Sequence, residues 1–199
     1  MPLALLAAIA FQDAALVRDL KPRVEHRYRV KVDSDMGTGF AYRIAFKVVG
    51  GKAAESNLEM KLSDYRATFE GHEVKNAKLG AGVLGIGALG LPSGLDISGP
   101  QGPFWISLLS LYLPDLKEDG DAPIDKSSVG KGLSLEGKAT LSHKDGKATV
   151  AIDGSIVREG KSLGKLTVST KINSDGWPRK SEGTLVSADG TYHFTLDRA

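Results

Sequence analysis

Two short patterns in this sequence match the spacing of catalytic or cofactor motifs, and both have a simpler explanation. Ser128-Val129-Gly130-Lys131 has the Ser-x-x-Lys spacing in which a lysine activates a serine for acyl transfer. The companion motifs of such enzymes are missing, and this segment is expected to lead into a strand instead of a helix. The glycines between 80 and 90 satisfy the dinucleotide fingerprint twice, but Leu91-Pro92-Ser93-Gly94 follows where the binding helix should begin. We therefore interpret these glycines as flexible or closely packed backbone.

Side chains that ligate metals or act as nucleophiles are sparse. The chain has no cysteine, and its four histidines, His26, His72, His143 and His193, lie far apart without a ligand spacing such as His-x3-His. The acidic residues between 115 and 125 lack the EF-hand spacing and its glycine, so a solvated loop is preferred to a calcium site. The sequence therefore predicts a protein that is not an enzyme and that carries no cofactor or metal.

The length and the net charge of the chain limit which classes of function are compatible with it. The chain has 199 residues, enough for one large domain. A chain of this size buries roughly 70% of its unfolded surface, so it needs no disulfide or metal to stabilise its core. The formal net charge is +2 and aromatic residues make up 7%, which gives no electrostatic or stacking case for nucleic acid. We therefore expect no nucleic-acid partner.

The amino terminus bears on localisation. Residues 3–11 form an apolar run of the length of a signal-peptide core, and Ala8-Ile9-Ala10 has the form of a cleavage site, but the basic residues that usually precede such a core are missing. Residues 1–20 are either a truncated signal peptide or a helix that packs on the domain. The first alternative predicts export to the periplasm or the medium, with cleavage before residue 24. Under either alternative, residues 21–199 are expected to form a single β-rich domain.

Most of the chain alternates apolar and polar residues with a period of two. This alternation is typical of antiparallel strands with one dry face. Asp-Gly pairs at 145, 175 and 189 favour tight hairpin turns. Ser63-Asp64 is expected to form a turn, and Asp153-Gly154 a bulge or bend inside a strand. The fold class is therefore mainly β, a curved antiparallel half-barrel of about nine strands. The strands are predicted at 24–32, 40–48, 57–62, 65–69, 133–143, 147–157, 163–173, 178–188 and 191–198.

The segment from Leu79 to Pro114 stands apart from the rest of the chain. It contains eight glycines and one charge in 36 residues, whereas 25% of the whole chain is charged. An apolar segment of this size must be buried or must meet a partner, so we expect it to cover the concave face of the sheet. Pro103 and Pro114 delimit a short helix of about three turns, with Ser110 on its outer face. Residues 117–132 are interpreted as a loop.

Several of these features together resemble a group of uncharacterised bacterial secreted β-rich proteins. That group is similar in architecture to the lipoprotein-carrier half-barrels of the bacterial envelope, which hold acyl chains against the concave face of a sheet. The resemblance covers residues 24–198 and implies an apolar ligand, but it transfers no catalytic residue. Besides the hydrophobic insertion, it rests on Leu113-Pro114, Pro123, Val129-Gly130, Asp175-Gly176-Trp177-Pro178 and Glu182-Gly183-Thr184-Leu185.

Three functions remain open at this point, the last of them an enzyme of unrecognised class. The first is an exported, half-barrel protein that binds or carries a lipid or other apolar small molecule. The second is a structural or protein-interaction module of the cell envelope, in which residues 79–114 meet a partner protein or are packed solid. His26 lies on the apolar phase of its strand, so a hydrogen-bonded core histidine is expected, with a ligand contact as the alternative. The candidate ligand-binding residues, for which plain core is the alternative, are Trp105, Leu108, Leu109, Tyr112, Phe104 and His26.

Overall fold

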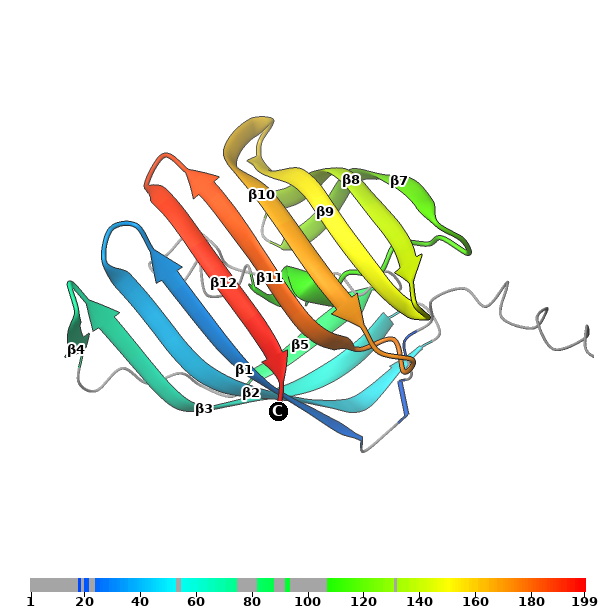
Figure 1. Ribbon diagram of the computed structural model, residues 1–199, viewed down its shortest axis with the longest axis horizontal. Helices are drawn as coiled ribbons and strands as arrows, with labels where there is room; N and C mark the ends of the chain where they lie inside the picture. The colour runs from blue at the N-terminus through cyan, green and yellow to red at the C-terminus, as the bar shows by residue number, and fades with distance from the viewer. Residues whose placement is uncertain are drawn as a thin grey trace, which may run out of the picture.

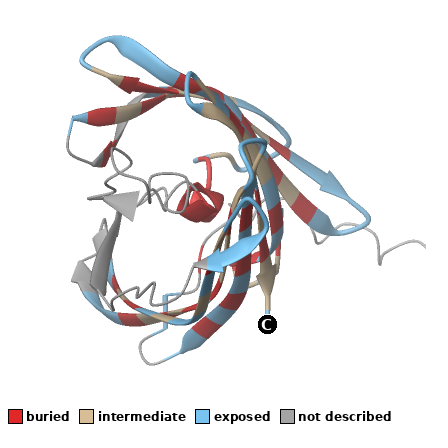
Figure 2. Ribbon diagram, turned by 90° about the vertical axis from the view of Figure 1, so that its left-hand side faces the viewer, coloured by how far each residue is buried: buried red, intermediate tan, exposed pale blue. Residues whose placement is uncertain are grey.

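The chain forms one antiparallel β-sheet that curls around a short 3-10 helix (Figures 1 and 2). The computed structural model describes residues 18, 20–21, 24–52, 55–74, 82–87, 92–93, 107–130 and 132–199. In this described part the sheet has twelve strands, and no helix is long and apolar enough to cross a membrane.

Apart from β7, the long strands are those expected from the alternating pattern, and the short ones lie between residues 72 and 93. The strands are β1 (Glu25–Ser34), β2 (Thr38–Lys52), β3 (Glu55–Phe69), β4 (His72–Val74), β5 (Gly82–Gly87), β6 (Pro92–Ser93), β7 (Gly120–Gly130), β8 (Leu133–Lys144), β9 (Lys147–Arg158), β10 (Lys161–Ile172), β11 (Pro178–Ser187) and β12 (Gly190–Arg198). The 3-10 helix η1 spans Ser107–Leu111.

The first and last long strands meet in the middle of the sheet. The strand order is β6-β5-β3-β2-β1-β12-β11-β10-β9-β8-β7, with β4 paired to β3. Because β1 pairs with β12, the two halves of the chain are joined by a ladder from Tyr28–Arg198 to Ser34–Tyr192. The end strands β6 and β7 lie near each other, but the described strands of the sheet are not paired across this gap. The sheet is therefore a nearly closed barrel with an open seam.

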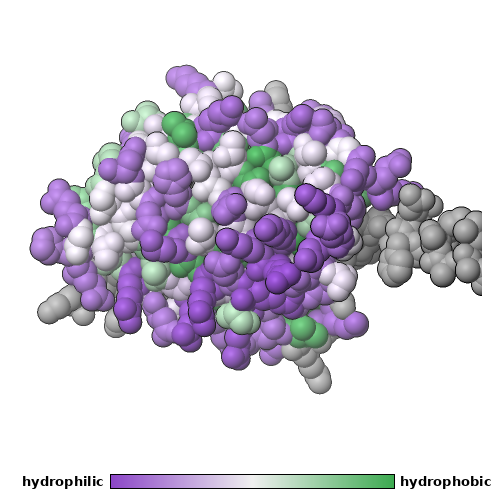
Figure 3. All heavy atoms as spheres, in the orientation of Figure 1, coloured by the Kyte–Doolittle hydropathy of each residue, from purple (hydrophilic) through white to green (hydrophobic). Residues whose placement is uncertain are grey.

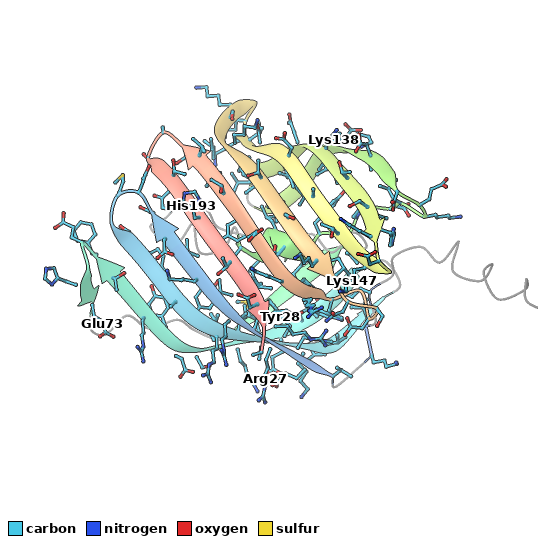
Figure 4. The ribbon with its side chains drawn as sticks, viewed as in Figure 1. Arg27, Tyr28, Glu73, Lys138, Lys147 and His193 are labelled. Atoms are coloured by element: carbon cyan, nitrogen blue, oxygen red, sulfur yellow. The ribbon has the colours of Figure 1, made fainter. Side chains whose placement is uncertain are left out.

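The inner face of the sheet is apolar and the outer face is polar. In β1 the residues alternate between exposed and buried, so that Arg27 and Tyr28 lie on opposite faces (Figure 4). The same stripes of burial run along the other long strands (Figure 2). The visible outer surface is mostly hydrophilic (Figure 3). A period-two pattern produces this result because successive side chains of a strand point to opposite sides.

The carboxyl-terminal meander is confirmed closely. The five predicted strands after residue 133 match β8 to β12 within three residues at each end. Asp145 and Gly146 both have positive φ, 52° and 70°, as the tight turn between β8 and β9 requires. All the aliphatic residues expected to face inward on β8, β9 and β10 are buried. Hydrophobic alternation was therefore sufficient to place this half of the sheet.

The predicted number of strands, about nine, is too low. Part of the segment expected to cover the sheet belongs to its wall, because β5 pairs with residues 55–60 of β3 and β6 extends it. The segment 117–132, interpreted as a loop, contains β7, which pairs with β8. The sequences of these strands are rich in glycine, proline or charged residues, which have low β-propensity. They form strands because the backbone of a neighbouring edge strand supplies their hydrogen-bond partners.

Two local expectations are corrected by the register of the strands. Ser63-Asp64 is not a turn: β3 runs through it, with Asp64 at φ 53° and a register shift opposite Ala41 and Arg43. This bulge moves the buried phase from even to odd residues, although Phe69 at the strand end is 52% exposed. Asp153-Gly154 is not a bulge, since Gly154 pairs in regular register with Gly137. A Cβ atom on Gly154 would lie 2.6 Å from the Glu136 carbonyl oxygen, so close backbone approach requires glycine there.

The predicted helix is also corrected in its described part. Instead of about three α-helical turns, residues 107–111 form the five-residue 3-10 helix η1. Ser110, expected on its outer face, is only 1% exposed. The reason is that η1 lies inside the curve of the sheet, where all five of its residues are buried.

Candidate functional site

The candidate site is the interior of the curled sheet, where η1 and the residues after it are packed. Leu108, Leu109 and Tyr112, three of the predicted ligand-binding residues, are at most 2% exposed. Helix η1 lies against β10, β11 and β12, and Figure 2 shows it inside the curve of the sheet. This part of residues 79–114 therefore covers the inner face, as expected from its composition.

Two polar contacts fix η1 in place, one at each end. The Tyr42 hydroxyl from β2 and the Ser107 hydroxyl are 3.0 Å apart and share a hydrogen bond. At the other end the Arg18 guanidinium donates from Nη2 to the carbonyl oxygen of Leu111. Burial raises the pKa of Tyr42 far above its ordinary value, so this phenol stays neutral and keeps its proton for hydrogen bonding. The helix is thus held by groups far from it in the sequence.

Arg18 belongs to a buried cluster of one guanidinium group and four rings, which we call the Arg18–Trp177 cluster. Its members are Arg18, His26, Tyr28, Phe46 and Trp177. The His26 and Trp177 rings are stacked, with centroids 3.9 Å apart and planes at 16°. The guanidinium carbon of Arg18 lies 4.9 Å from the centre of the Trp177 ring, within the range of a cation–π contact. Phe46 lies 6.4 Å from Trp177 and 5.9 Å from Tyr28. The cluster joins the amino-terminal segment, β1, β2 and the β10–β11 connection.

The turn before β11 positions Trp177. The Trp177 backbone N–H donates to the Asp175 carboxylate at 3.0 Å, and Gly176 adopts φ 73°, which glycine permits without strain. Asp175 also accepts from Arg198 Nη1 at 2.8 Å. Arg198 Nη2 and His26 Nδ1 are 3.1 Å apart, and since the arginine can only donate, His26 Nδ1 is the acceptor. The expectation of a buried, hydrogen-bonded His26 is confirmed, with 3% of its surface exposed.

The Arg18 charge is not neutralised by a carboxylate in the described part of the chain. Its Nε donates to the Gly176 carbonyl oxygen at 3.4 Å and its Nη2 to Leu111, both uncharged acceptors. Asp175 contributes only a longer-range attraction, because its hydrogen bonds go to Arg198 and Trp177. Burial lowers the pKa of Arg18 to about 10, so the side chain is still charged at neutral pH.

Three buried polar atoms lack a hydrogen-bond partner among the described residues. They are Arg18 Nη1, the Tyr28 hydroxyl oxygen and the Ser110 hydroxyl oxygen. Tyr28 is fully buried, and that burial raises its pKa well above the usual range. Leaving a buried donor unpaired costs about 1–3 kcal/mol, and more when the group is charged.

The structure brings together only some of the predicted site residues. Leu108, Leu109 and Tyr112 lie around η1, whereas His26 lies in the Arg18–Trp177 cluster. Phe104 and Trp105 lie outside the described residues. Sequence reasoning missed four residues of the cluster: Arg18, Tyr28, Phe46 and Trp177. Tyr28 carried the same apolar-phase signal as His26, and Trp177 was used only as part of a turn, but no local pattern singles out Arg18.

The remaining histidine contacts are surface pairs. His143 Nδ1 lies 2.6 Å from Asp119, and His193 Nδ1 lies 3.1 Å from the Thr184 hydroxyl. Asp119, His143 and His193 are exposed, and Thr184 is partly buried. Among the described residues no group of three or more histidines and carboxylates is placed to hold a metal ion. Thr184 and His193 form a cross-strand pair between β11 and β12, whereas Asp119, the residue before β7, contacts His143 of β8.

Comparisons with known proteins give distant structural likeness only. No protein family and no curated protein matches the sequence. The fold is similar to a β-barrel-like protein of a domain of unknown function, DUF1849, from Brucella abortus, with 10% identity, a TM-score of 0.35, and 90% of this chain and 100% of that chain covered. It is similar to the hypothetical protein CT021 from Chlamydia trachomatis, with 8% identity, a TM-score of 0.33, and coverage of 94% and 93%. A redesigned β-barrel, mFAP0, bound to DFHBI, gives 13% identity, a TM-score of 0.22, and coverage of 90% and 99%.

Proposed function

We propose that this chain is an exported, non-catalytic protein that binds an apolar ligand inside its curled sheet. The observation that carries the proposal is the size of the apolar interior relative to what fills it. A closed barrel of eight strands has an interior just wide enough for its own side chains. Here the described strands of the sheet follow a path of eleven, and the inner face takes up residues 107–114 as an additional layer. An interior that admits an extra layer is a natural place for an apolar ligand.

The open seam supports the same proposal. A ligand must reach the interior, and a fully closed barrel gives access only through its ends. The described part of the sheet ends at β6 and β7, which approach each other without pairing. The unpartnered polar atoms add a second argument, because small-molecule sites typically combine an apolar lining with a few precisely placed polar groups.

Dye binding tests the proposal. An environment-sensitive apolar dye should bind to the wild type after bound amphiphiles have been stripped, and Ala139→Leu should weaken its binding by about 10-fold because the added bulk enters the interior. Ala139 is completely buried on β8. Ala151 on the adjacent strand is exposed and is opposite Thr140, so Ala151→Leu is the matched control and should leave the dye affinity unchanged. Fluorescence titration measures all three proteins. A folded wild type that binds no dye would contradict the proposal.

A second candidate function is a structural or protein-interaction module of the cell envelope. The complete burial of residues 107–114 favours it, since a cover that is packed solid leaves no room for a ligand. This candidate predicts that the folded wild type ignores the dye, while Ala139→Leu is destabilised by about 1–3 kcal/mol through overpacking. The dye titration and a denaturant titration of the same two proteins therefore decide between the candidates.

Export is the part of the proposal that rests on the amino terminus. The apolar run at residues 3–11 and Ala8-Ile9-Ala10 support it. Arg18 holds Leu111 and Gly176, so a cleavage between residues 18 and 24 would remove a buried anchor of the fold. We therefore expect the mature chain to begin between residue 11 and Arg18. The intact mass of the protein purified from its own host measures this, and recovery of the uncleaved chain from the cytoplasm would defeat it.

A further inference from the structure

The Arg18–Trp177 cluster contains two hydrogen-bond donors that have no partner among the described residues. Arg18 is 8% exposed and Tyr28 is not exposed at all, so water does not replace the missing partners at the surface. The open donors are Arg18 Nη1, with its two N–H groups, and the Tyr28 hydroxyl. Both atoms belong to side chains on the inner side of the sheet, next to the proposed ligand space.

Arg18 and Tyr28 belong to one continuous group of contacts. The Arg18 guanidinium lies 4.9 Å from the centre of the Trp177 ring, Trp177 lies 6.4 Å from Phe46, and Phe46 lies 5.9 Å from Tyr28. The rings supply an apolar wall, and the guanidinium and the phenol supply donors at its surface. A site with these two parts suits a molecule that is apolar along most of its length and accepts hydrogen bonds at one end.

The positive charge of the cluster restricts which chemical group the polar end of the ligand can carry. A buried charge is costly unless a counter-charge accompanies it. Arg198 has Asp175 as a partner at 2.8 Å, whereas no carboxylate of the described residues forms an ion pair with Arg18. One positive charge is therefore uncompensated. A carboxylate brings one negative charge and two acceptor oxygens, whereas a phosphate monoester brings a charge of about −1.5 to −2 and would leave an excess.

We infer that Arg18 and Tyr28 form the head-group site for a long-chain carboxylic acid, whose carboxylate accepts from Arg18 Nη1 and from the Tyr28 hydroxyl. This inference rests on the proposed function, because the acyl tail occupies the apolar interior next to residues 107–114. It makes the ligand an acidic amphiphile and gives the cluster a role beyond anchoring the amino-terminal segment. If Arg18 only stabilised the fold, the protein would not prefer an acidic amphiphile to a neutral one.

A pair of ligands of equal chain length tests the head group. Lauric acid and methyl laurate should both displace the apolar dye from the wild type, with the acid binding at least about 10-fold more tightly, as expected for a hydrogen bond to a charged group. Tyr28→Phe keeps the ring and removes the hydroxyl, and should reduce the preference for the acid by several-fold. Arg18→Met should abolish the preference for the acid.

Arg29→Met is the matched control. Arg29 follows Tyr28 on β1 by one residue and lies exposed on the outer face, so its loss should leave the preference for the acid intact. Equal affinity of the wild type for acid and ester would overturn the inference while the proposed function stands. Unchanged preference in both Tyr28→Phe and Arg18→Met would also overturn it. Failure of both ligands to displace the dye, or failure of the dye itself to bind, would instead reject the proposed function together with the inference.

Discussion

Leu108→Asp should lower the free energy of unfolding by about 3 kcal/mol or more, because it buries a carboxylate without a partner inside the curled sheet. Leu108 is completely buried in η1, between wall strands on several sides. The aspartate cannot turn toward solvent there, since its neighbours in η1 are equally buried. Denaturant titration followed by circular dichroism measures the loss.

Leu163→Asp is the control for this substitution. Leu163 lies on β10 with 39% of its surface exposed, so the same change should cost less than about 1 kcal/mol. Ser110, which the sequence placed on an outer helix face, is no suitable control because it is buried. If Leu108→Asp is as mild as Leu163→Asp, and protease cleaves the folded protein between residues 107 and 114, then this segment does not form part of the core.

Trp177→Ala should destabilise the protein by about 3–5 kcal/mol. The ring is completely buried, stacks on His26 at 3.9 Å and lies beneath the Arg18 guanidinium at 4.9 Å. Removing the ring leaves a cavity and takes away the cation–π partner of the buried Arg18 guanidinium. Contacts are therefore lost both in β1 and in the β10–β11 connection. The free energy of unfolding from denaturant titration provides the measurement.

Phe69→Ala provides the comparison for the loss of an aromatic ring. Phe69 is 52% exposed at the end of β3 and has no core position to vacate, so its loss should cost less than about 1 kcal/mol. Equal effects of Trp177→Ala and Phe69→Ala would mean that the Arg18–Trp177 cluster does not stabilise the fold. A large effect of Trp177→Ala together with loss of the preference for lauric acid would connect stability and ligand binding at the same cluster.

The sequence predicted the parts of the fold that depend on local patterns. Alternation along β8 to β12 and the Asp145-Gly146 turn were recognised because each signal lies within a few neighbouring residues. Strands β5 and β7 were missed, since their glycines, prolines and charges favour loops until an adjacent edge strand supplies hydrogen bonds. The burial of Leu108 was predictable from the scarcity of charge around it, whereas that of Ser110 follows only from the position of η1 inside the curved sheet.

The candidate site was predictable in its apolar part only. Leu108, Leu109 and Tyr112 were found because a hydrophobic segment must be covered. The polar part depends on contacts between residues far apart in the sequence: Arg18 reaches Leu111 and Gly176 over separations of 93 and 158 residues. No local pattern in one sequence indicates such a contact, and a single arginine near an apolar amino terminus carries no distinguishing signal.

Native mass spectrometry of the protein purified from its own host tests the central claim most directly. We predict a complex heavier than the mature polypeptide by the mass of a bound amphiphile, and the released ligand should be a long-chain carboxylic acid. Tyr28→Phe, expressed and purified in the same host, should retain less of it. A folded protein whose native mass equals that of the chain alone, from wild type and variant alike, would contradict the claim that the interior of the sheet binds a ligand.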